Sequence, residues 1–397
     1  MKKKIVFVME SLRIGGAEKS LVTLLSLLDK DQYDIYLYLF RNSGPFLEQL
    51  PKNITMIQIP LADTFQINNF KSAWLKYLSK GSFKKAFYSM KWLAGCIFSK
   101  YIKRNDEYIG WKHLTKIYTG IEGHFDAAVG YLEKKTTYFV VDHVDADKKI
   151  AFMHTDYDLI SHNEKLDAAY YTQINRLAVV SEHTKQTMLK HFPDLAGKIA
   201  VIKNMVSSEI IMAMSEKDAP ELNSADPNTI IILTVGRLTA AKHIDSAIKI
   251  LKKLRDDGIE AEWYVVGEGE ERAHLETLIQ ELCLEDAFHL LGARSNPYPY
   301  MKLCDIYVQP SRWEGFGITV TEAKVLSKPI ITSDIPEFRE QLRNGKTGLL
   351  CANENEMYAS IKKMIEDKEF RYTFAENLSG YQPDYCELDK FMNLLEA

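Results

Sequence analysis

Two glutamates stand eight positions apart around a Gly-Phe-Gly turn, in the stretch SRWEGFGITVTEA. Glu314 comes before the turn, and Glu322 follows it inside a run with the apolar spacing of a helix. The apolar stretch CDIYVQP directly before them is typical of a buried strand. A glycine turn between a strand and a helix start presents backbone N–H groups, which bind phosphate. The pattern predicts a phosphate cradle that also carries two carboxylates.

Two cations follow another predicted strand, TIIILTVGR. Arg237 and Lys242 stand five positions apart in GRLTAAK. An Arg fork and a Lys point charge at a strand end can converge on one diphosphate, although alone they could equally be two surface cations. A nucleoside-diphosphate sugar has hydroxyl groups on both sides of its diphosphate. We therefore interpret the two glutamates as acceptors of hydrogen bonds from the ribose and from the transferable sugar.

The elements that position these residues are short strands alternating with helical segments. Such alternation predicts parallel sheets with crossover connections, and 397 residues are too many for one ordinary core. We predict an α/β protein with two Rossmann-like domains, residues 1–206 and 207–380, and a C-terminal helix, 381–397, that packs back on the first. The acidic, proline-bearing stretch 212–228 is typical of a linker or surface loop. Ligands of such sheets bind at the carboxyl ends of the strands, so the inter-domain cleft is the expected site.

Composition excludes several classes of protein. The apolar fraction of 46% and the charged fraction of 26% are those of a globular protein. Five cysteines without CxxC spacing argue against a disulfide framework or a zinc site and are typical of a reducing cytoplasm. No apolar run approaches the roughly 18 residues that span a bilayer. The short run Ile5–Met9 is interpreted as a first strand and not as a signal peptide.

A basic segment interrupts the mildly acidic balance of the chain. Residues Lys71–Lys116 contain eleven Lys and Arg against two acids, with aromatic residues between them, in a protein of net charge −4. Two interpretations stay open: a solvated face of ordinary amphipathic helices, or a segment that lies on an anionic membrane surface. Nucleic acid is disfavoured, because the chain as a whole is acidic and has no recognisable nucleic-acid motif.

Several motifs occur in order along the chain: IGGAE, GRLxxxK, VGEGEER, PSxxEGFG with its E-x7-E pair, and NGKTGLL. Together they resemble the retaining glycosyltransferases of family 4, of the type that assembles bacterial polysaccharides and glycans, which have the GT-B fold. The resemblance is strong from about Thr229 to Leu350. In the first domain it rests on the Gly-Gly loop, Phe152-Met153-His154, Val180-Ser181 and Lys203-Asn204.

The resemblance implies a role for each matching residue of the second domain. Glu314 would hold hydroxyls of the donor sugar, and Glu322 the ribose. Arg237 and Lys242 would neutralise the diphosphate and stabilise the leaving nucleotide, which is a metal's work in other transferases. Arg294 would contact the base, mainly through its backbone. Backbone N–H groups for the diphosphate would come from Gly315, Phe316, Gly317, Ile318 and Thr319.

In the first domain the resemblance implies two further contacts. Gly16 would approach the phosphate or the acceptor from the opposite domain, and His154 would contact the donor sugar near its anomeric carbon. The chain departs from the family at His243 and Ser327, where the family usually has glycine, so we expect the local packing to differ there.

The function that the resemblance implies is transfer of a hexose or N-acetylhexosamine from a nucleoside-diphosphate sugar, expected to be a UDP-sugar, to a glycan or lipid-linked acceptor. His154 and Glu314 would act at the reacting sugar, without a metal or other cofactor, in the cytoplasm or on the inner face of the cell membrane. Two alternatives stay open. One is a metal-dependent transferase that uses Asp145-Ala146-Asp147 or Asp156-Tyr157-Asp158. The other is a non-catalytic partner subunit that kept the fold.

Overall fold

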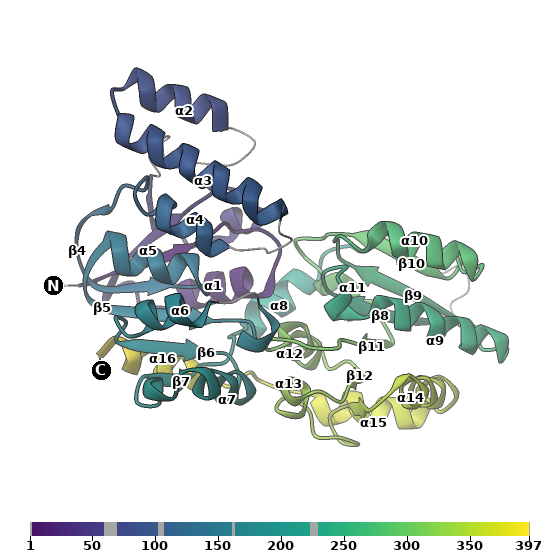
Figure 1. The fold of residues 1–397 in the computed structure, drawn as a ribbon. Helices are drawn as coiled ribbons and strands as arrows, with labels where there is room; N and C mark the ends of the chain where they lie inside the picture. The colour runs from purple at the N-terminus through teal and green to yellow at the C-terminus, as the bar shows by residue number, and fades with distance from the viewer. Residues whose placement is uncertain (1, 59–69, 102–106, 161–162, 223–228, 397) are drawn as a thin grey trace. The chain divides into compact units, whose positions relative to one another are not determined.

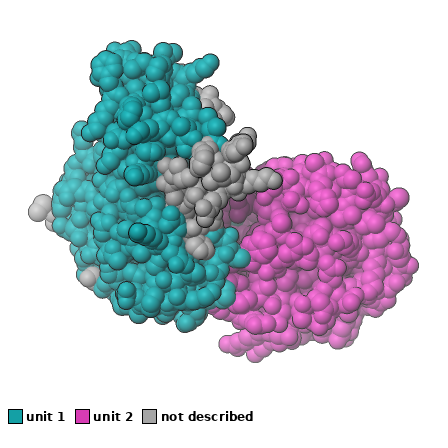
Figure 2. All heavy atoms as spheres, in the orientation of Figure 1, with its two compact units in different colours: residues 1–13, 17–203, 386–397 teal, residues 14–16, 204–385 magenta. Residues whose placement is uncertain are grey.

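A computed structural model describes residues 2–58, 70–101, 107–160, 163–222 and 229–396 (Figure 1). Its contacts divide the chain into two compact units, coloured separately in Figure 2. Unit 1 contains residues 1–13, 17–203 and 386–397, and unit 2 contains residues 14–16 and 204–385. The sequence predicts the boundary between the two domains at residues 206 and 207. Residues 102–106 of the basic segment and 223–228 of the expected linker lie outside the described residues.

Unit 1 is built on a parallel sheet with strand order β3-β2-β1-β4-β5-β6-β7. The order reverses between β1 and β4, which pair in parallel, so the loops that follow these two strands turn to opposite sides. The central strands are nearly continuous apolar runs, as expected of strands covered on both faces. The described strands are β1 (Lys3–Met9), β2 (Tyr33–Leu39), β3 (Thr55–Ile57), β4 (Ile121–Gly130), β5 (Val144–Met153), β6 (Arg176–Val179) and β7 (Ile199–Val201).

Helices cover this sheet, and the last helix of the chain is one of them. The Phe391 ring of α16 lies 6.0 Å from the Phe7 ring of β1 and 6.0 Å from the Phe152 ring of β5. The backbone N–H of Lys203 also donates to Glu387 of α16 at 2.8 Å. The described helices of unit 1 are α1 (Gly16–Leu27, of which Gly16 groups with unit 2), η1 (Pro45–Gln49), α2 (Phe70–Ser79), α3 (Phe83–Tyr101), α4 (Glu107–Leu114), α5 (Lys135–His143), η3 (Tyr157–Leu159), α6 (Glu164–Tyr171), α7 (Glu182–His191), η4 (Pro193–Leu195) and α16 (Cys386–Glu396).

Unit 2 has its own parallel sheet, with strand order β10-β9-β8-β11-β12-β13. Its described strands are β8 (Ile230–Val235), β9 (Ala261–Val266), β10 (Phe288–Gly292), β11 (Ile306–Gln309), β12 (Ile330–Ser333) and β13 (Leu349–Cys351). Its described helices are α8 (Ser208–Ser215), η5 (Ala240–Lys242), α9 (Ile244–Asp256), α10 (Arg272–Glu281), α11 (Tyr298–Leu303), α12 (Ile318–Val325), α13 (Pro336–Arg339), α14 (Glu354–Glu366) and α15 (Lys368–Leu378).

The core of unit 2 explains why these segments fold as they do. The strongly amphipathic helix α9 buries Ile244, Ile248 and Leu251 against Trp263 of β9 and Val308 of β11. Burying such side chains is worth about 1.5–3 kcal/mol each, so this packing fixes both sheet and helix. Within the described residues, no helix is long and apolar enough to cross a membrane.

Candidate active site

The sheet of unit 2 brings one predicted cation, Lys242, to one predicted acid, Glu314. Strand order reverses between β8 and β11, which pair in parallel. At such a reversal the following loops turn to opposite sides and leave a crevice beyond the strand ends. Arg237 and Lys242 follow β8, and Glu314 follows β11. Lys242 and Glu314 therefore meet at the place where open parallel sheets bind ligands, and Arg237 follows the same strand as Lys242.

Lys242 and Glu314 form an ion pair at this point. The Lys242 Nζ lies 2.5 Å from both Glu314 carboxylate oxygens, and the two side chains are only 16% and 8% exposed. Ser311 Oγ donates to the same carboxylate at 2.7 Å, and Gln309 Nε2 donates to Ser311 Oγ at 2.9 Å. Glu314 is thus held from two sides, and its negative charge is compensated.

The glycine turn between β11 and α12 has the geometry that only glycine adopts easily. Gly317 has φ 78°, and a Cβ there would lie 2.5 Å from Cε1 of Phe338. The side-chain amide of Gln341 donates to the carbonyl of Phe316 and so fixes the turn. Phe316 and Ile318 are buried, whereas Gly315 and Thr319 are half-buried. The start of α12 leaves helix N–H groups without intrahelical partners, as the predicted phosphate cradle requires.

Glu322 lies one turn into α12 and is fully buried. The hydroxyl of Tyr298, from α11, donates to Glu322 Oε1 at 3.1 Å. Burial and the neighbouring Glu322 raise the pKa of Tyr298 well above its usual range, so this phenol stays a donor. No motif of the sequence points to Tyr298, because this residue comes from a different helix.

Arg237 is exposed, and among the described residues it forms no ion pair. Its loop is fixed through the backbone, since Gly236 N–H donates to Val266 O at 3.1 Å and Leu238 N–H donates to Glu268 O at 3.0 Å. The close approach explains a glycine of the VGEGEER motif: a Cβ at Gly267 would lie 1.7 Å from the carbonyl oxygen of Gly236. The guanidinium is thus presented to solvent from a rigid backbone.

Arg294 follows β10 and is tied to unit 2 by a three-member network. Its guanidinium lies 2.8 Å from Glu221 Oε1 and 3.3 Å from the hydroxyl of Tyr300, which itself donates to Glu221 Oε2 at 2.6 Å. With its side chain occupied in this way, Arg294 has its backbone left for the predicted base contact.

The two departures from the family pattern share one backbone feature. His243 has φ 54° and Ser327 has φ 51°, both in the left-handed region that favours glycine. His243 and Ser327 therefore adopt the backbone conformation that glycine permits, at a cost of about 1–2 kcal/mol each. Ser327 Oγ donates to Leu378 O at 3.1 Å, which offsets part of this.

Gly16 stands at the end of the loop after β1. Its loop residues 14–16 group with unit 2, and a Cβ at Gly16 would lie 3.3 Å from Cγ2 of Ile318, the first residue of α12. The tight spacing means that a larger residue at position 16 would displace Ile318.

His154 follows β5 in unit 1 and is buried. Its ring lies 5.0 Å from the Tyr131 ring and stacks on Phe152 at 5.6 Å. Its backbone N–H donates to Glu133 Oε2 at 3.2 Å. Glu133 comes from the loop after β4, at the strand reversal of this sheet, and it precedes Lys134, which has φ 62°. Sequence analysis missed Glu133, although the strained residue after it marks a loop with a defined shape.

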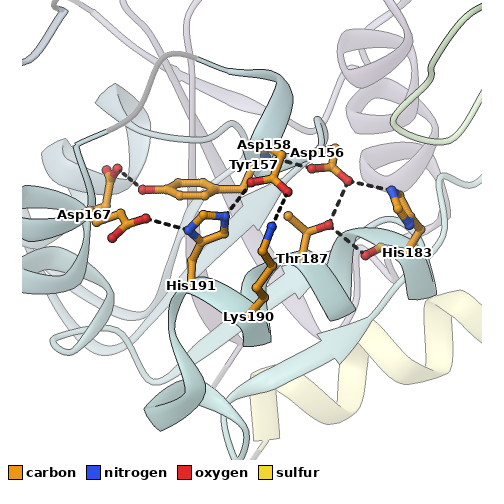
Figure 3. A network of polar contacts seen from close by, with 9 residues as sticks. Asp156, Tyr157, Asp158, Asp167, His183, Thr187, Lys190 and His191 are labelled. Carbon is orange, nitrogen blue, oxygen red and sulfur yellow. Dashed lines mark hydrogen bonds and ion pairs between the residues drawn. The ribbon is translucent and has the colours of Figure 1, made fainter.

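The two Asp-x-Asp sequences have structural partners, and Figure 3 shows those of Asp156 and Asp158. Asp156 accepts hydrogen bonds from Thr187 Oγ1 and from the backbone N–H of Asp158, and it pairs with His183 at 2.9 Å. Asp158 in turn lies 2.5 Å from His191 Nε2. These contacts fasten η3, just beyond His154, to α7.

The other pair, Asp145 and Asp147, flanks the exposed imidazole of His124 at 3.1 and 3.2 Å. In the described parts of the chain, no group of three or more His, Cys, Asp or Glu side chains is arranged to hold a metal ion.

Comparison with known proteins addresses the same region. Residues 215–379 match the family described as Glycosyl transferases group 1. They form a glycosyl transferases group 1 domain. A Campylobacter jejuni relative is N-acetylgalactosamine-N,N'-diacetylbacillosaminyl-diphospho-undecaprenol 4-alpha-N-acetylgalactosaminyltransferase, 28% identical over 215 residues. That match covers 53% of this chain and 56% of the relative, so the chain spans about half the length of the curated relative.

Solved structures resemble the whole chain. Anabaena HepE, in complex with UDP and glucose, aligns over 100% of both chains with a TM-score of 0.70 at 17% identity. WaaG, a glycosyltransferase involved in lipopolysaccharide biosynthesis, covers 98% of this chain and 99% of its own, with a TM-score of 0.61 at 16% identity. Together with the two parallel sheets, these likenesses confirm the predicted fold, two Rossmann-like units of the GT-B type.

Proposed function

We propose that this protein is a retaining glycosyltransferase that moves a hexose or N-acetylhexosamine from a UDP-sugar to a glycan or lipid-linked acceptor. The observation that carries the proposal is the Lys242–Glu314 pair beside the α12 turn, at the strand reversal of a glycosyl transferases group 1 domain. The UDP in the HepE complex and the undecaprenol-linked substrate in the Campylobacter relative's name support the choice of donor and acceptor.

In this proposal the diphosphate lies at the N-terminal end of α12, where helix N–H groups favour an anion. Lys242 and Arg237 supply positive charge to the diphosphate as the bond between it and the sugar breaks. Preorganised charge of this kind acts where negative charge develops, so it lowers the barrier more than it strengthens binding of the ground state. Glu314 then accepts hydrogen bonds from sugar hydroxyls, and Glu322 from the ribose.

The anomeric configuration is retained in the proposed reaction. The acceptor hydroxyl attacks the anomeric carbon on the face from which the diphosphate leaves, and its proton passes to the departing phosphate oxygen. In this proposal that oxygen acts as the base, because neither glutamate of the α12 turn is placed as a nucleophile: Glu314 is bound to Lys242, and Glu322 is buried against Tyr298. His154 contacts the donor sugar near the anomeric carbon and orients it.

The proposal is tested by donor hydrolysis across a panel of nucleotide sugars, which needs no acceptor. We expect one UDP-sugar to be hydrolysed, and Glu314→Gln to lower its turnover strongly because that side chain faces the reacting sugar. Glu281→Gln, on the exposed end of α10, removes the same charge from the same unit and serves as the control. Absence of hydrolysis with every donor, together with no detectable UDP binding, would indicate a non-catalytic subunit instead.

We further propose that the reaction needs no divalent metal and no other cofactor. The support is that Arg237, Lys242 and the start of α12 provide positive charge for a leaving diphosphate. Activity in EDTA should equal activity with added manganese or magnesium. Loss of activity in EDTA that manganese restores would refute metal independence. We place the reaction in the cytoplasm, at the inner face of the cell membrane, because the Campylobacter relative's name contains an undecaprenol-linked substrate.

A further inference from the structure

Helix α3 uses one of its faces to build a small core with α2 and α4 in unit 1. Trp92 and Ala86 are buried there together with Tyr77 of α2 and Ile117 beyond α4. Ser89 lies on the same face, also buried, and donates to Ala86 O at 2.7 Å. The side chains of α3 that the structure describes as buried all belong to this face.

A neighbouring face of α3 carries a second apolar row, which is exposed. Phe83 is 70% exposed, Phe87 50%, Met90 47% and Ile97 64%, and Ala94 between the last two is also exposed. Their spacing of four, three, four and three residues places all five on one line along the helix. We name these five residues the α3 stripe. Large apolar side chains are rarely exposed in such continuity unless they meet a partner.

Lysines border the α3 stripe. Lys84 and Lys91, seven positions apart and both exposed, lie along one side of it, and Lys91 Nζ lies 4.7 Å from the centre of the Phe87 ring. Lys80, just before the helix, is exposed as well. The sequence has no acid at all between Lys71 and Asn105. The charge beside the stripe is therefore of one sign.

We propose that the α3 stripe docks this protein on an anionic lipid surface. A helix with an apolar face and flanking lysines lies in the interface between lipid headgroups and acyl chains, with its rings buried and its cations at the headgroups. An anionic leaflet supplies both complements, negative charge and an apolar layer. Docking through α3 goes beyond the transfer reaction and does not depend on it, since binding can be measured without any donor or acceptor.

The test is co-sedimentation of the full chain with vesicles. One set consists of phosphatidylcholine alone, and the other contains phosphatidylglycerol at about a third of the lipid. We expect binding to the anionic vesicles at low salt, weaker binding at high salt because the charges are screened, and little binding to phosphatidylcholine alone. A parent protein that fails to sediment with anionic vesicles at low salt overturns the proposal.

Matched variants locate the surface. Lys84→Gln/Lys91→Gln should lower the apparent partition coefficient about 30-fold, because each lysine near such a surface contributes about fivefold. Lys30→Gln/Lys52→Gln removes the same charge from exposed positions outside α2–α4 and should leave binding nearly unchanged. If both double variants lose binding equally, the attraction is one of overall charge, and α3 is not the docking surface.

The apolar component has its own variant pair. Phe83→Ser/Phe87→Ser should weaken binding by about tenfold for each ring, the lower end for burial of a phenylalanine. Leu303→Ser, at an exposed leucine of unit 2, is the control and should bind as the parent does. All three positions are exposed, so circular dichroism and UDP-sugar hydrolysis should match the parent. If the parent is a dimer in solution and the Phe double variant a monomer, the stripe joins two copies of the chain, and the proposal is wrong.

Discussion

Breaking the Lys242–Glu314 ion pair from either side should destabilise unit 2. The carboxylate contacts Lys242 Nζ through both oxygens, and both side chains are largely shielded from water. Lys242→Met leaves the Glu314 charge with only Ser311 as a donor, and Glu314→Gln leaves the ammonium without its anion. Removing one partner of a buried pair costs about 3–5 kcal/mol. The partial exposure of Lys242 leads us to expect about 3 kcal/mol for each single variant.

The double variant separates the pair from its surroundings. Lys242→Met/Glu314→Gln removes both charges, so no unpaired charge is left, and its loss should fall short of the summed losses by about 2 kcal/mol. The free energy of unfolding is measured in urea at pH 7 by circular dichroism and tryptophan emission. The control is the exposed pair Lys252–Asp256 on α9, where Lys252→Met/Asp256→Asn should show coupling below about 0.5 kcal/mol. Additive losses at Lys242 and Glu314, within about 0.5 kcal/mol, would show that the contact contributes nothing.

Three further predictions concern single residues. Glu322→Gln should weaken binding of free UDP by tenfold or more, since a hydrogen bond to a charged group contributes about 1.5–3 kcal/mol; calorimetry that finds equal affinity refutes the ribose role. Ser327→Gly relieves a left-handed conformation and should raise the free energy of unfolding, measured in urea, by up to about 1 kcal/mol. A decrease of that size in the free energy of unfolding would show that the Oγ contact dominates. Burial alone would lower the pKa of His191, but hydrogen bonds to Asp158 and Glu164 outweigh it and raise that pKa above 6.5. The charged imidazole therefore stabilises the fold fully below about pH 6.5, and this stabilisation is lost as pH rises through the raised pKa. The melting temperatures of the parent and of His191→Gln should converge between about pH 6 and pH 9. A difference in melting temperature that stays constant over this range contradicts the prediction.

The strands and the fold class were predictable, because the strands of parallel sheets that are covered on both faces have continuous apolar sequences. The runs of β8 and β11 could be recognised in this way, and so could the glycine turn that starts α12. The strand order could not be seen in the sequence. It is the order that makes β8 and β11 neighbours and so brings Lys242 to Glu314, 72 positions along the chain.

Residues whose role depends on a tertiary contact could not be predicted from the sequence, for the same reason. Tyr298 and Glu133 carry no motif, and their importance appears only when α11 lies beside α12 and the loop after β4 lies beside His154. The sequence also does not predict the pairing of Lys242 with Glu314, because the motifs indicate the diphosphate for Lys242 and the sugar hydroxyls for Glu314. A one-dimensional pattern shows which side chains suit a ligand and not which of them already contact one another.

The partners of the two glutamates explain how acids can stand beside a phosphate cradle. Glu314 is compensated by a cation, and Glu322 accepts from the phenol of Tyr298 deep in unit 2. On the proposed function, a diphosphate that takes Lys242 would leave Glu314 with an uncompensated charge unless the same ligand also brings hydroxyl donors. A nucleotide sugar brings them, and a bare diphosphate does not. A ligand can therefore take Lys242 from Glu314 at low cost only if its own hydroxyl groups then donate to Glu314. On the proposed function, this exchange favours nucleotide sugars over other diphosphates.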